Sequence, residues 1–237
     1  MQLYPAESGA ATPSATAALR TPALLVLAHG AGAGQKHPFM VTIARGLAAR
    51  GIDVATFDFP YMQQKRKAPD KTPVLEAAFR AAIAEARGQV TPEHAIFIGG
   101  KSMGGRIATH LAAQWADLQV GPCRGVVALG YPLHPPGKPE QRRIAHLPSI
   151  AVPVLIVQGE RDAFGTPAEL RPVVETMRAG VTLHVVEGGD HSLAVARSSG
   201  TAQKQVYEHV LDTIAAWMAS VSRAAAGPPP APLRRGA

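Results

Sequence analysis

Short, nearly all apolar runs alternate along the chain with longer stretches in which apolar residues recur at helical spacing. The apolar runs have the length of single strands and are bounded by Gly or Pro, which is typical of strands covered on both faces. They predict strands over residues 23–28, 52–57, 94–99, 125–130, 153–158 and 181–186. The stretches between them predict helices over residues 38–50, 73–87, 103–116, 167–178 and 202–221.

This alternation predicts an α/β protein: a three-layer α/β/α sandwich with a mostly parallel sheet of six to seven strands and right-handed crossovers. We expect the folded domain to span residues 21–223, between a flexible N-terminal arm over residues 1–20 and a disordered, Pro-rich tail over residues 224–237. The Pro-rich connection over residues 131–149, with a short helix around 139–146, predicts a lid-like insertion that forms a substrate wall. The alternative is a surface excursion without a role.

Composition narrows the class of protein. Of the 237 residues 46% are hydrophobic and 17% are charged, so the chain can bury one large core and disorder as its main state is excluded. No apolar run approaches the roughly 18 residues that span a bilayer, and no signal peptide is recognisable. The single cysteine, Cys123, cannot form an intrachain disulfide or a cysteine-based metal cluster. We therefore expect a cytoplasmic protein with no membrane partner, metal or cofactor.

Positive charge exceeds negative charge. The chain has 24 Lys and Arg against 17 Asp and Glu, a formal net charge of +7. Four of the basic residues lie in one segment, the basic loop over residues 65–71: Lys65, Arg66, Lys67 and Lys71. Nucleic-acid-binding surfaces combine basic residues with aromatic ones, but no aromatic residue lies between these four. We expect no nucleic-acid partner. The basic loop either favours an anionic acyl substrate or is simply solvated.

The sharpest local signal is GGKSMGG at residues 99–105, between a predicted strand and a predicted helix. It contains G-x-S-x-G, the nucleophile elbow, with Ser102 at its centre. The serine of such an elbow sits on a tight, strained turn that raises Oγ above the sheet, and Gly100 and Gly104 must be small to allow it. The spacing therefore predicts Ser102 as a nucleophile.

A phosphate-binding loop, G-x-x-x-x-G-K-[ST], shares the letters Gly100-Lys101-Ser102. That motif needs glycine at position 95, where this chain has Ala95, and residues 95–99 read as a strand rather than a loop. The phosphate-loop interpretation therefore fails.

An elbow serine needs a base and a residue that orients the base, and in hydrolases of this architecture the chain order is Ser, Asp or Glu, then His. Asp162 and His191 each follow a predicted buried strand in that order. The carboxyl ends of parallel strands share one rim, where ligands bind. Asp190 and Glu160 are alternatives to Asp162 as the orienting carboxylate.

Two backbone amides are expected to form an oxyanion hole. Met103 begins the helix that follows Ser102, where its N–H group is free to face an oxyanion. The Gly-rich turn after the first predicted strand supplies the second donor in this fold, and we assign it to Ala31, with Gly32 as the nearest competitor.

These residues resemble the α/β-hydrolase superfamily over roughly residues 23–221. The segments HGAGAG (29–34), FDFPYMQQKRKAPD (57–70), GGKSMGGR (99–106) and GYPLHPPGKPE (130–140) resemble a narrower group of small, dienelactone-hydrolase-like proteins. Its eukaryotic relatives include a testis-expressed protein and a subunit of a chromatin-regulating acetyltransferase complex. The resemblance implies a Ser–Asp–His triad and metal-free hydrolysis of an acyl bond. Dienelactone hydrolases proper resemble a cysteine-nucleophile variant, whereas this chain has Ser102.

Together these features predict a serine hydrolase that cleaves a carboxylic ester or related acyl bond of a small molecule through an acyl-enzyme on Ser102. The hypothetical pocket walls are Tyr61, Met62, Tyr131, Leu133 and His134. The alternative is a non-catalytic interaction scaffold that kept the fold, because a fold does not fix a function.

Overall fold

A seven-stranded sheet forms the centre of the computed structural model, which describes residues 1–7, 22–115, 121–196 and 202–226. Its strands are β1 (Gln2–Tyr4), β2 (Ala23–Ala28), β3 (Asp53–Phe57), β4 (Ala95–Lys101), β5 (Cys123–Leu129), β6 (Val154–Gly159) and β7 (Val181–Val186). The strand order is β1-β3-β2-β4-β5-β6-β7, and every pair is parallel except β1 with β3. The predicted fold class is confirmed.

Strand β1 corrects the expectation of a flexible N-terminal arm over residues 1–20. Residues 2–4 pair antiparallel with β3, Leu3 opposite Ala55 and Tyr4 opposite Val54, and close one edge of the sheet. The side chain of Tyr4 is buried. Residues 8–20 of the predicted arm lie outside the described part of the chain.

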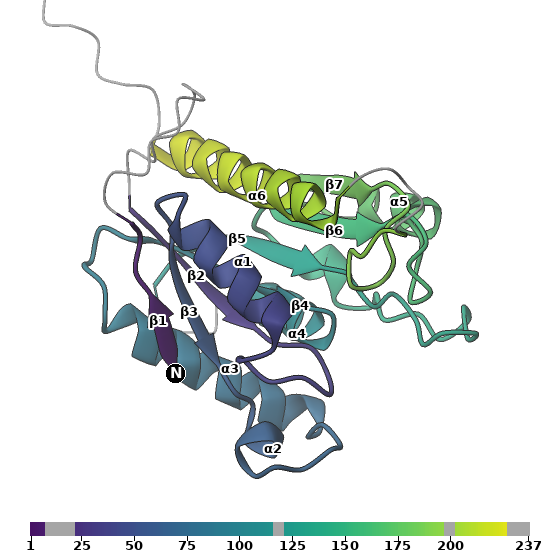
Figure 1. Cartoon of the computed structure of the whole chain (residues 1–237), viewed down its shortest axis with the longest axis horizontal. Helices are drawn as coiled ribbons and strands as arrows, with labels where there is room; N and C mark the ends of the chain where they lie inside the picture. The colour runs from purple at the N-terminus through teal and green to yellow at the C-terminus, as the bar shows by residue number, and fades with distance from the viewer. Residues whose placement is uncertain (8–21, 116–120, 197–201, 227–237) are drawn as a thin grey trace, which may run out of the picture.

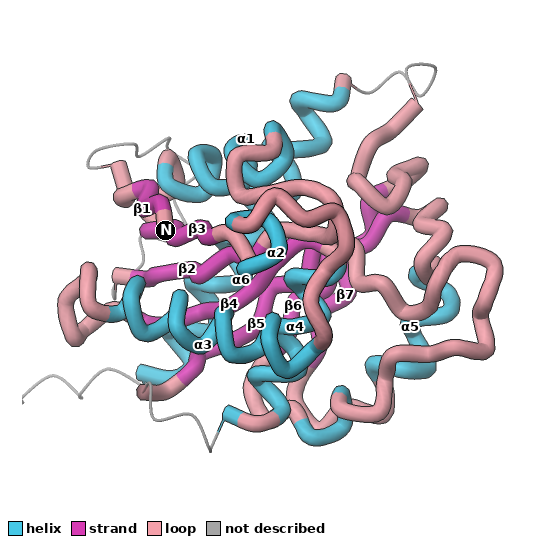
Figure 2. The backbone as a smooth tube through the Cα atoms, turned by 90° about the horizontal axis from the view of Figure 1, so that it is seen from below, coloured by secondary structure: helices cyan, strands magenta, loops and turns pink. Residues whose placement is uncertain are grey.

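Helices cover both faces of the sheet (Figure 1). The helices are α1 (Pro38–Ala48), α2 (Pro60–Gln63), α3 (Thr72–Arg87), α4 (Met103–Ala113), α5 (Pro167–Val174) and α6 (Gln203–Ala226). Helices α1 and α6 lie side by side on one face, and α3 and α4 lie on the other, as the two perpendicular views show (Figures 1 and 2). The short α2 was not predicted, and α6 extends to Ala226, into the predicted tail, whose residues 227–237 lie outside the described part.

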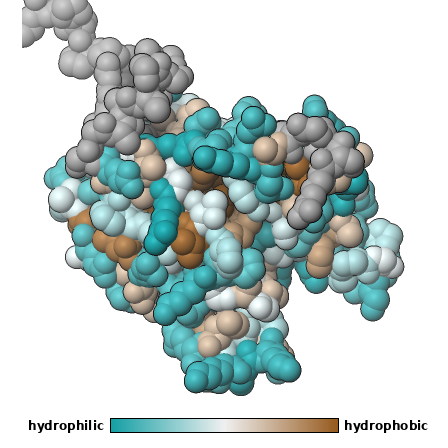
Figure 3. All heavy atoms as spheres, in the orientation of Figure 1, coloured by the Kyte–Doolittle hydropathy of each residue, from teal (hydrophilic) through white to brown (hydrophobic). Residues whose placement is uncertain are grey.

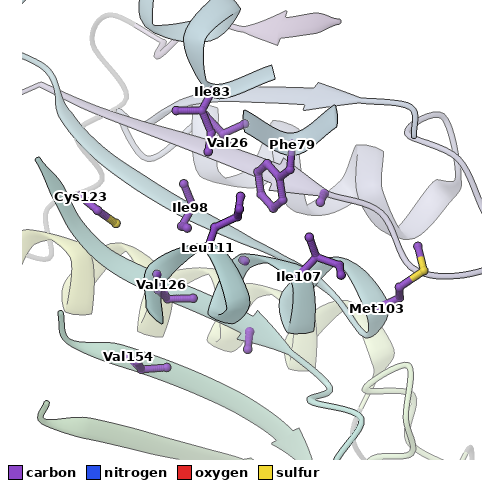
Figure 4. Packing of buried hydrophobic residues seen from close by; sticks show 14 of the residues in the cluster. Val26, Phe79, Ile83, Ile98, Met103, Ile107, Leu111, Cys123, Val126 and Val154 are labelled. Carbon is purple, nitrogen blue, oxygen red and sulfur yellow. The ribbon is translucent and has the colours of Figure 1, made fainter. Parts of the chain in front are cut away.

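The core has one layer on each side of the sheet. On the α3 and α4 side, Phe79, Ile107 and Leu111 pack over the strand residues Ile98 and Val126 (Figure 4). On the other side, residues of α1 and α6 pack over the strand residues whose side chains point to the opposite face, such as Phe97 and Val127. Strands β2 and β4 are buried along their whole length. The apolar sequence of β2 predicts this, whereas β4 also buries Lys101 at its end.

The insertion over residues 131–149 contains no helix at 139–146, so that expectation is wrong. The segment follows an irregular path, broken by its prolines, and its one helical turn is a 3₁₀ turn at Leu147–Ser149. Two hydrogen bonds across the loop fix the path. The Tyr131 side-chain hydroxyl donates to the Arg143 carbonyl at 2.6 Å, and the Arg143 N–H donates to the Leu133 carbonyl at 2.8 Å.

The outer surface is mostly hydrophilic or neutral on the face seen in Figure 3, with hydrophobic residues in small separate groups. Among the described residues only Met1 and Val74 are large hydrophobic side chains that are exposed. None of the described helices combines the length and apolar character needed to cross a membrane.

Candidate active site

Three side chains from three loops meet at the carboxyl ends of β4, β6 and β7. Ser102 directly follows β4, Asp162 follows β6, and His191 follows β7. His191 Nε2 lies 2.8 Å from Ser102 Oγ, and His191 Nδ1 lies 2.8 Å from Asp162 Oδ2. The structure therefore brings the three residues predicted from chain order into one continuous hydrogen-bonded relay, which is the arrangement that activates a serine.

The turn at Ser102 has the backbone conformation expected of a nucleophile elbow. Ser102 has φ 49° and ψ −115°, a region that side-chain-bearing residues rarely adopt, so the turn is strained. A Cβ atom on Gly100 would lie 2.5 Å from the Gly104 carbonyl carbon, and a Cβ on Gly104 would lie 2.6 Å from the His29 carbonyl oxygen. Only glycine fits at these two positions, which is the steric reason for the G-x-S-x-G pattern.

Asp162 is held in one orientation by donors on both of its carboxylate oxygens. Its side chain is buried, Oδ1 accepts from the Phe164 N–H at 2.8 Å, and Oδ2 accepts from Gln158 Nε2 at 2.8 Å as well as facing His191. A buried carboxylate needs such partners to stay in place. The two alternative carboxylates do not reach His191: Glu160 accepts from the Gly188 N–H, and Asp190 accepts from the N–H groups of Ser192 and Ala194.

The imidazole of His191 is positioned from two further sides. The Phe164 ring stacks on it, with centroids 4.1 Å apart and planes inclined by 28°. Lys101 Nζ donates to the His191 carbonyl oxygen. Lys101 is itself buried, and burial lowers the pKa of its ammonium to about 8, partly offset by the negative charges of Asp162 and Asp190.

Lys101 makes the stability of the protein depend on pH. Its pKa is about 8 in the folded protein against an ordinary 10.5, so between these values the unfolded state binds more protons and stability rises with pH. We expect the free energy of unfolding of the wild type, minus that of Lys101→Met, to rise by about 1.4 kcal/mol per pH unit across this window. Urea unfolding at several pH values measures it. Lys36→Met, at an exposed lysine, should keep the wild-type slope. A Lys101→Met slope equal to that of the wild type would contradict the assignment.

A cavity of about 640 Å³ opens beside Ser102 and His191. The predicted oxyanion donors Ala31 and Met103 both line it, whereas Gly32 does not. Its other lining residues come mainly from α1, α3 and the segment before it, α4, the insertion and the loops after β6 and β7. They include Phe39, Met40, Leu75, Arg106, Pro132, Arg143 and Phe164. Among the described residues, no three His, Cys, Asp or Glu side chains are grouped to hold a metal ion.

The turn that carries Ala31 is held by His29. The Phe59 N–H donates to His29 Nε2 at 3.1 Å, so Nδ1 carries the proton and donates to the Gly30 carbonyl at 2.8 Å. Burial lowers the pKa of His29, which keeps the ring neutral and this pattern intact. The Tyr61 hydroxyl also donates to the Gly30 carbonyl, at 3.4 Å. Asp58 anchors the far end of the turn by accepting from the Gln35 N–H at 2.7 Å.

None of the five predicted pocket walls lines this cavity, so that expectation is wrong. Tyr61, Tyr131 and Leu133 are fully buried in the core, and their side chains support the surrounding loops instead. His134 is also buried, with Nε2 3.1 Å from Glu169 at the start of α5. Met62 packs at the edge of the core. The insertion does contribute to the cavity wall, but through Pro132 and Arg143.

Gln158 and Phe164 are site residues that sequence reasoning missed. Gln158 is fully buried near the end of β6: its Nε2 donates to Asp162 and to the Gly165 carbonyl at 2.7 Å, and its Oε1 accepts from the Tyr131 N–H at 2.7 Å. It thus connects the loop of Asp162 to the insertion. The sequence does mark Gln158, because it is the one polar side chain in the apolar strand sequence VLIVQG. A buried amide needs several hydrogen-bond partners, so a glutamine at this position indicates a polar network near the end of the strand.

Solved structures of several hydrolases have a similar fold. A dienelactone hydrolase from Anabaena variabilis superimposes with a TM-score of 0.60, 18% sequence identity and coverage of 81% of this chain and 85% of that one. A monoacylglycerol lipase from Paleococcus ferrophilus superimposes with a TM-score of 0.62 and 19% sequence identity, covering 85% of this chain and 96% of that one. Est1E from Butyrivibrio proteoclasticus, bound to ferulic acid, has a TM-score of 0.61 and 15% sequence identity, covering 82% of this chain and 90% of that one. At these identities the likeness concerns the fold alone.

The family comparison agrees with this fold. The sequence model of the α/β hydrolase domain matches residues 21–219, most of the chain and all seven residues of the elbow segment 99–105. The match begins just before β2 and ends within α6, so it includes every strand except β1. On this match and on the architecture around Ser102, the chain belongs to the α/β hydrolase domain family.

Proposed function

We propose that the chain is a serine hydrolase that cleaves a carboxylic ester, or a related acyl bond, through an acyl-enzyme on Ser102. The observation that carries this proposal is the relay from Ser102 Oγ through His191 to Asp162, with both contacts at 2.8 Å. A serine hydroxyl is a weak nucleophile unless an adjacent base takes its proton, and this geometry supplies that base.

In the proposed reaction Ser102 Oγ attacks the acyl carbonyl carbon while His191 Nε2 accepts the hydroxyl proton. The tetrahedral intermediate collapses with loss of the alcohol, which takes that proton from His191, and leaves the acyl group on Ser102. Water then attacks the acyl-enzyme by the same steps and releases the acid. Asp162 stabilises the His191 imidazolium that forms in each half-reaction, and it fixes the orientation of the ring by accepting a hydrogen bond from Nδ1–H.

The negative charge of the tetrahedral intermediate is assigned to the backbone N–H groups of Met103 and Ala31. Support comes from their positions: Met103 is the first residue of α4, whose N-terminal amides have no partner within the helix, and both residues line the cavity. Each oxyanion donor of this kind contributes a factor of about 10² to 10³ to the rate.

A partition experiment tests the acyl-enzyme. Esters that share one acyl group but differ in the alcohol are hydrolysed in the presence of hydroxylamine, and the ratio of hydroxamate to free acid is measured. If every ester passes through the same acyl-enzyme on Ser102, the ratio is the same for all of them at a fixed hydroxylamine concentration.

A ratio that changes with the alcohol would contradict a common acyl-enzyme. If the folded protein hydrolysed no ester of a broad panel, the esterase hypothesis would be wrong. That result would favour the interaction scaffold suggested by the resemblance to the testis-expressed protein and the acetyltransferase-complex subunit, and a search for protein partners would follow.

A further inference from the structure

Two arginines from distant parts of the chain line the cavity beside Ser102. Arg106 belongs to the first turns of α4, and Arg143 belongs to the insertion. Both side chains are half-buried. The pKa of the Arg106 guanidinium is lowered, first by burial and then by the positive charge of Arg143, so the two cations lie close enough to repel each other. Such an arrangement is unfavourable unless an anion lies between or against them.

The hydrogen-bonding capacity of the two guanidinium groups is largely unused. A guanidinium has five N–H donors. Among the described residues, Arg106 has one side-chain contact, from Nη1 to His110 Nε2 at 3.5 Å, and Arg143 has one, from Nη1 to the Pro132 carbonyl at 3.4 Å. Both distances are at the long limit for a hydrogen bond. Within the same described ranges neither arginine has a carboxylate oxygen within 4.0 Å.

The carboxylates of this region have other partners. Asp70 lines the cavity but accepts from Arg66 Nη2 at 2.5 Å and from the Tyr61 N–H at 3.0 Å. Glu76 faces His110 Nδ1 at 3.1 Å. Neither carboxylate therefore forms an ion pair with Arg106 or Arg143 in this structure. Glu76 is near enough to raise the pKa of Arg106 but does not pair with it, and Lys101 is a third basic side chain among the residues that line the cavity.

The position of Arg106 relative to Ser102 fits a group on the substrate. The Arg106 N–H donates to the Ser102 carbonyl at 3.0 Å, so the two residues are one helical turn apart, about 6 Å along the axis. Side chains on a helix lean toward its N-terminus, which directs Arg106 back over the turn that carries Ser102. A group bound by Arg106 would lie several bonds away from a carbonyl carbon at Ser102 Oγ. Leu75, Pro132 and Phe164 give the same cavity apolar walls that suit the intervening hydrocarbon.

We propose that Arg106 and Arg143 together bind a carboxylate of the substrate, so that the preferred substrates are esters that carry a second, free carboxylate, such as monoesters of short dicarboxylic acids. A guanidinium matches the two oxygens of a carboxylate with parallel N–H donors, which makes arginine the residue suited to this recognition. The basic loop is not the source of this preference, because it contributes only Asp70 and its neighbour Pro69 to the cavity and none of its lysines. The proposal rests on the proposed function, since it places the anion relative to an acyl group on Ser102.

Two para-nitrophenyl esters of equal chain length, the hexanoate and the monoester of adipic acid, test the preference. The wild type should show a higher kcat/KM for the anionic ester. Arg106→Gln and Arg143→Gln should each lower the ratio of the two kcat/KM values by about 10- to 100-fold, the effect of losing a hydrogen bond to a charged group. Arg106→Lys, which keeps the charge, should restore part of the ratio. Arg142→Gln, at the exposed neighbour of Arg143, is the matched control and should leave the ratio unchanged.

A binding measurement separates this proposal from the proposed function. Titration calorimetry of adipate into the Ser102→Ala variant should show binding that weakens with salt and is lost when Arg106→Gln or Arg143→Gln is added. Adipate binding without turnover of any ester would overturn the hydrolase and leave the anion site standing. Turnover with no preference for the anionic ester, or a preference that survives both glutamine variants, would overturn the anion site alone. Tighter binding of inorganic phosphate than of adipate would overturn the carboxylate assignment.

Discussion

Replacing Ser102 by alanine should lower kcat for ester hydrolysis by about 10⁴- to 10⁶-fold, because the residues of a triad act as a unit and removing the nucleophile removes the acyl-enzyme route. The variant should fold as the wild type does, since alanine is no larger than serine and Ser102 Oγ has only His191 as a side-chain partner among the described residues. Steady-state kinetics with the best ester of a panel, together with a thermal unfolding curve, measures both.

Ser149→Ala is the matched control for this change. Ser149 is exposed in the 3₁₀ turn of the insertion and does not line the cavity, so its replacement should leave kcat near the wild-type value. Residual activity of Ser102→Ala within about tenfold of the wild type would mean that another group performs the attack, because a factor of ten corresponds to only about 1.4 kcal/mol of the barrier.

Replacing Asp162 by asparagine should lower kcat by about 10⁴-fold, with little change in the fold. The reason lies in the donors around this carboxylate. Oδ1 faces the Phe164 N–H and Oδ2 faces Gln158 Nε2, so an asparagine keeps at most one of these contacts with its oxygen. The amide carries no negative charge, so in either orientation it stabilises the imidazolium less than the carboxylate does. In the orientation that places the oxygen at the Phe164 N–H, the amino group faces His191 Nδ1, which must then accept. The proton moves to Nε2, and His191 can no longer take the Ser102 proton.

Glu160→Gln provides the comparison for Asp162→Asn. Glu160 is two residues away on the same loop, accepts one hydrogen bond from the Gly188 N–H, and can keep that bond as glutamine. Steady-state kinetics should give a kcat close to the wild-type value for Glu160→Gln. If Glu160→Gln lost as much activity as Asp162→Asn, the assignment of the orienting carboxylate would be wrong.

The fold and the relay could be predicted because they are encoded by strong local patterns. Strands β2 and β7 begin and end where the apolar runs do, since both termini of each run carry a turn residue or a change of polarity. Ser102 is found by its glycines, which the structure explains as steric requirements. Asp162 and His191 are predicted from their order after two predicted strands, whose carboxyl ends the parallel topology brings to one rim. The strand before His191, β7, is a half-buried edge strand rather than the buried strand that the sequence predicted.

The cavity walls could not be predicted in the same way. From the sequence, Tyr61 and Tyr131 fit a pocket wall as well as they fit the core. Both rings are buried because of the path that their loops follow, which the sequence pattern does not show. Arg143 becomes a cavity residue because the proline-rich insertion folds back through the hydrogen bonds of Tyr131 and Leu133. Strand β1 is three residues long and pairs with β3, more than forty residues away in the chain, so no local pattern marks it.

The activated state of Ser102 is the central claim, and covalent labelling with a fluorophosphonate, read by intact mass, tests it without knowledge of the substrate. We expect a single adduct on the wild type, none on Ser102→Ala, and strongly slowed labelling of His191→Ala, because no imidazole would then accept the serine proton. Folded wild-type protein that forms no adduct, at reagent concentrations that label a control serine hydrolase, would contradict this claim.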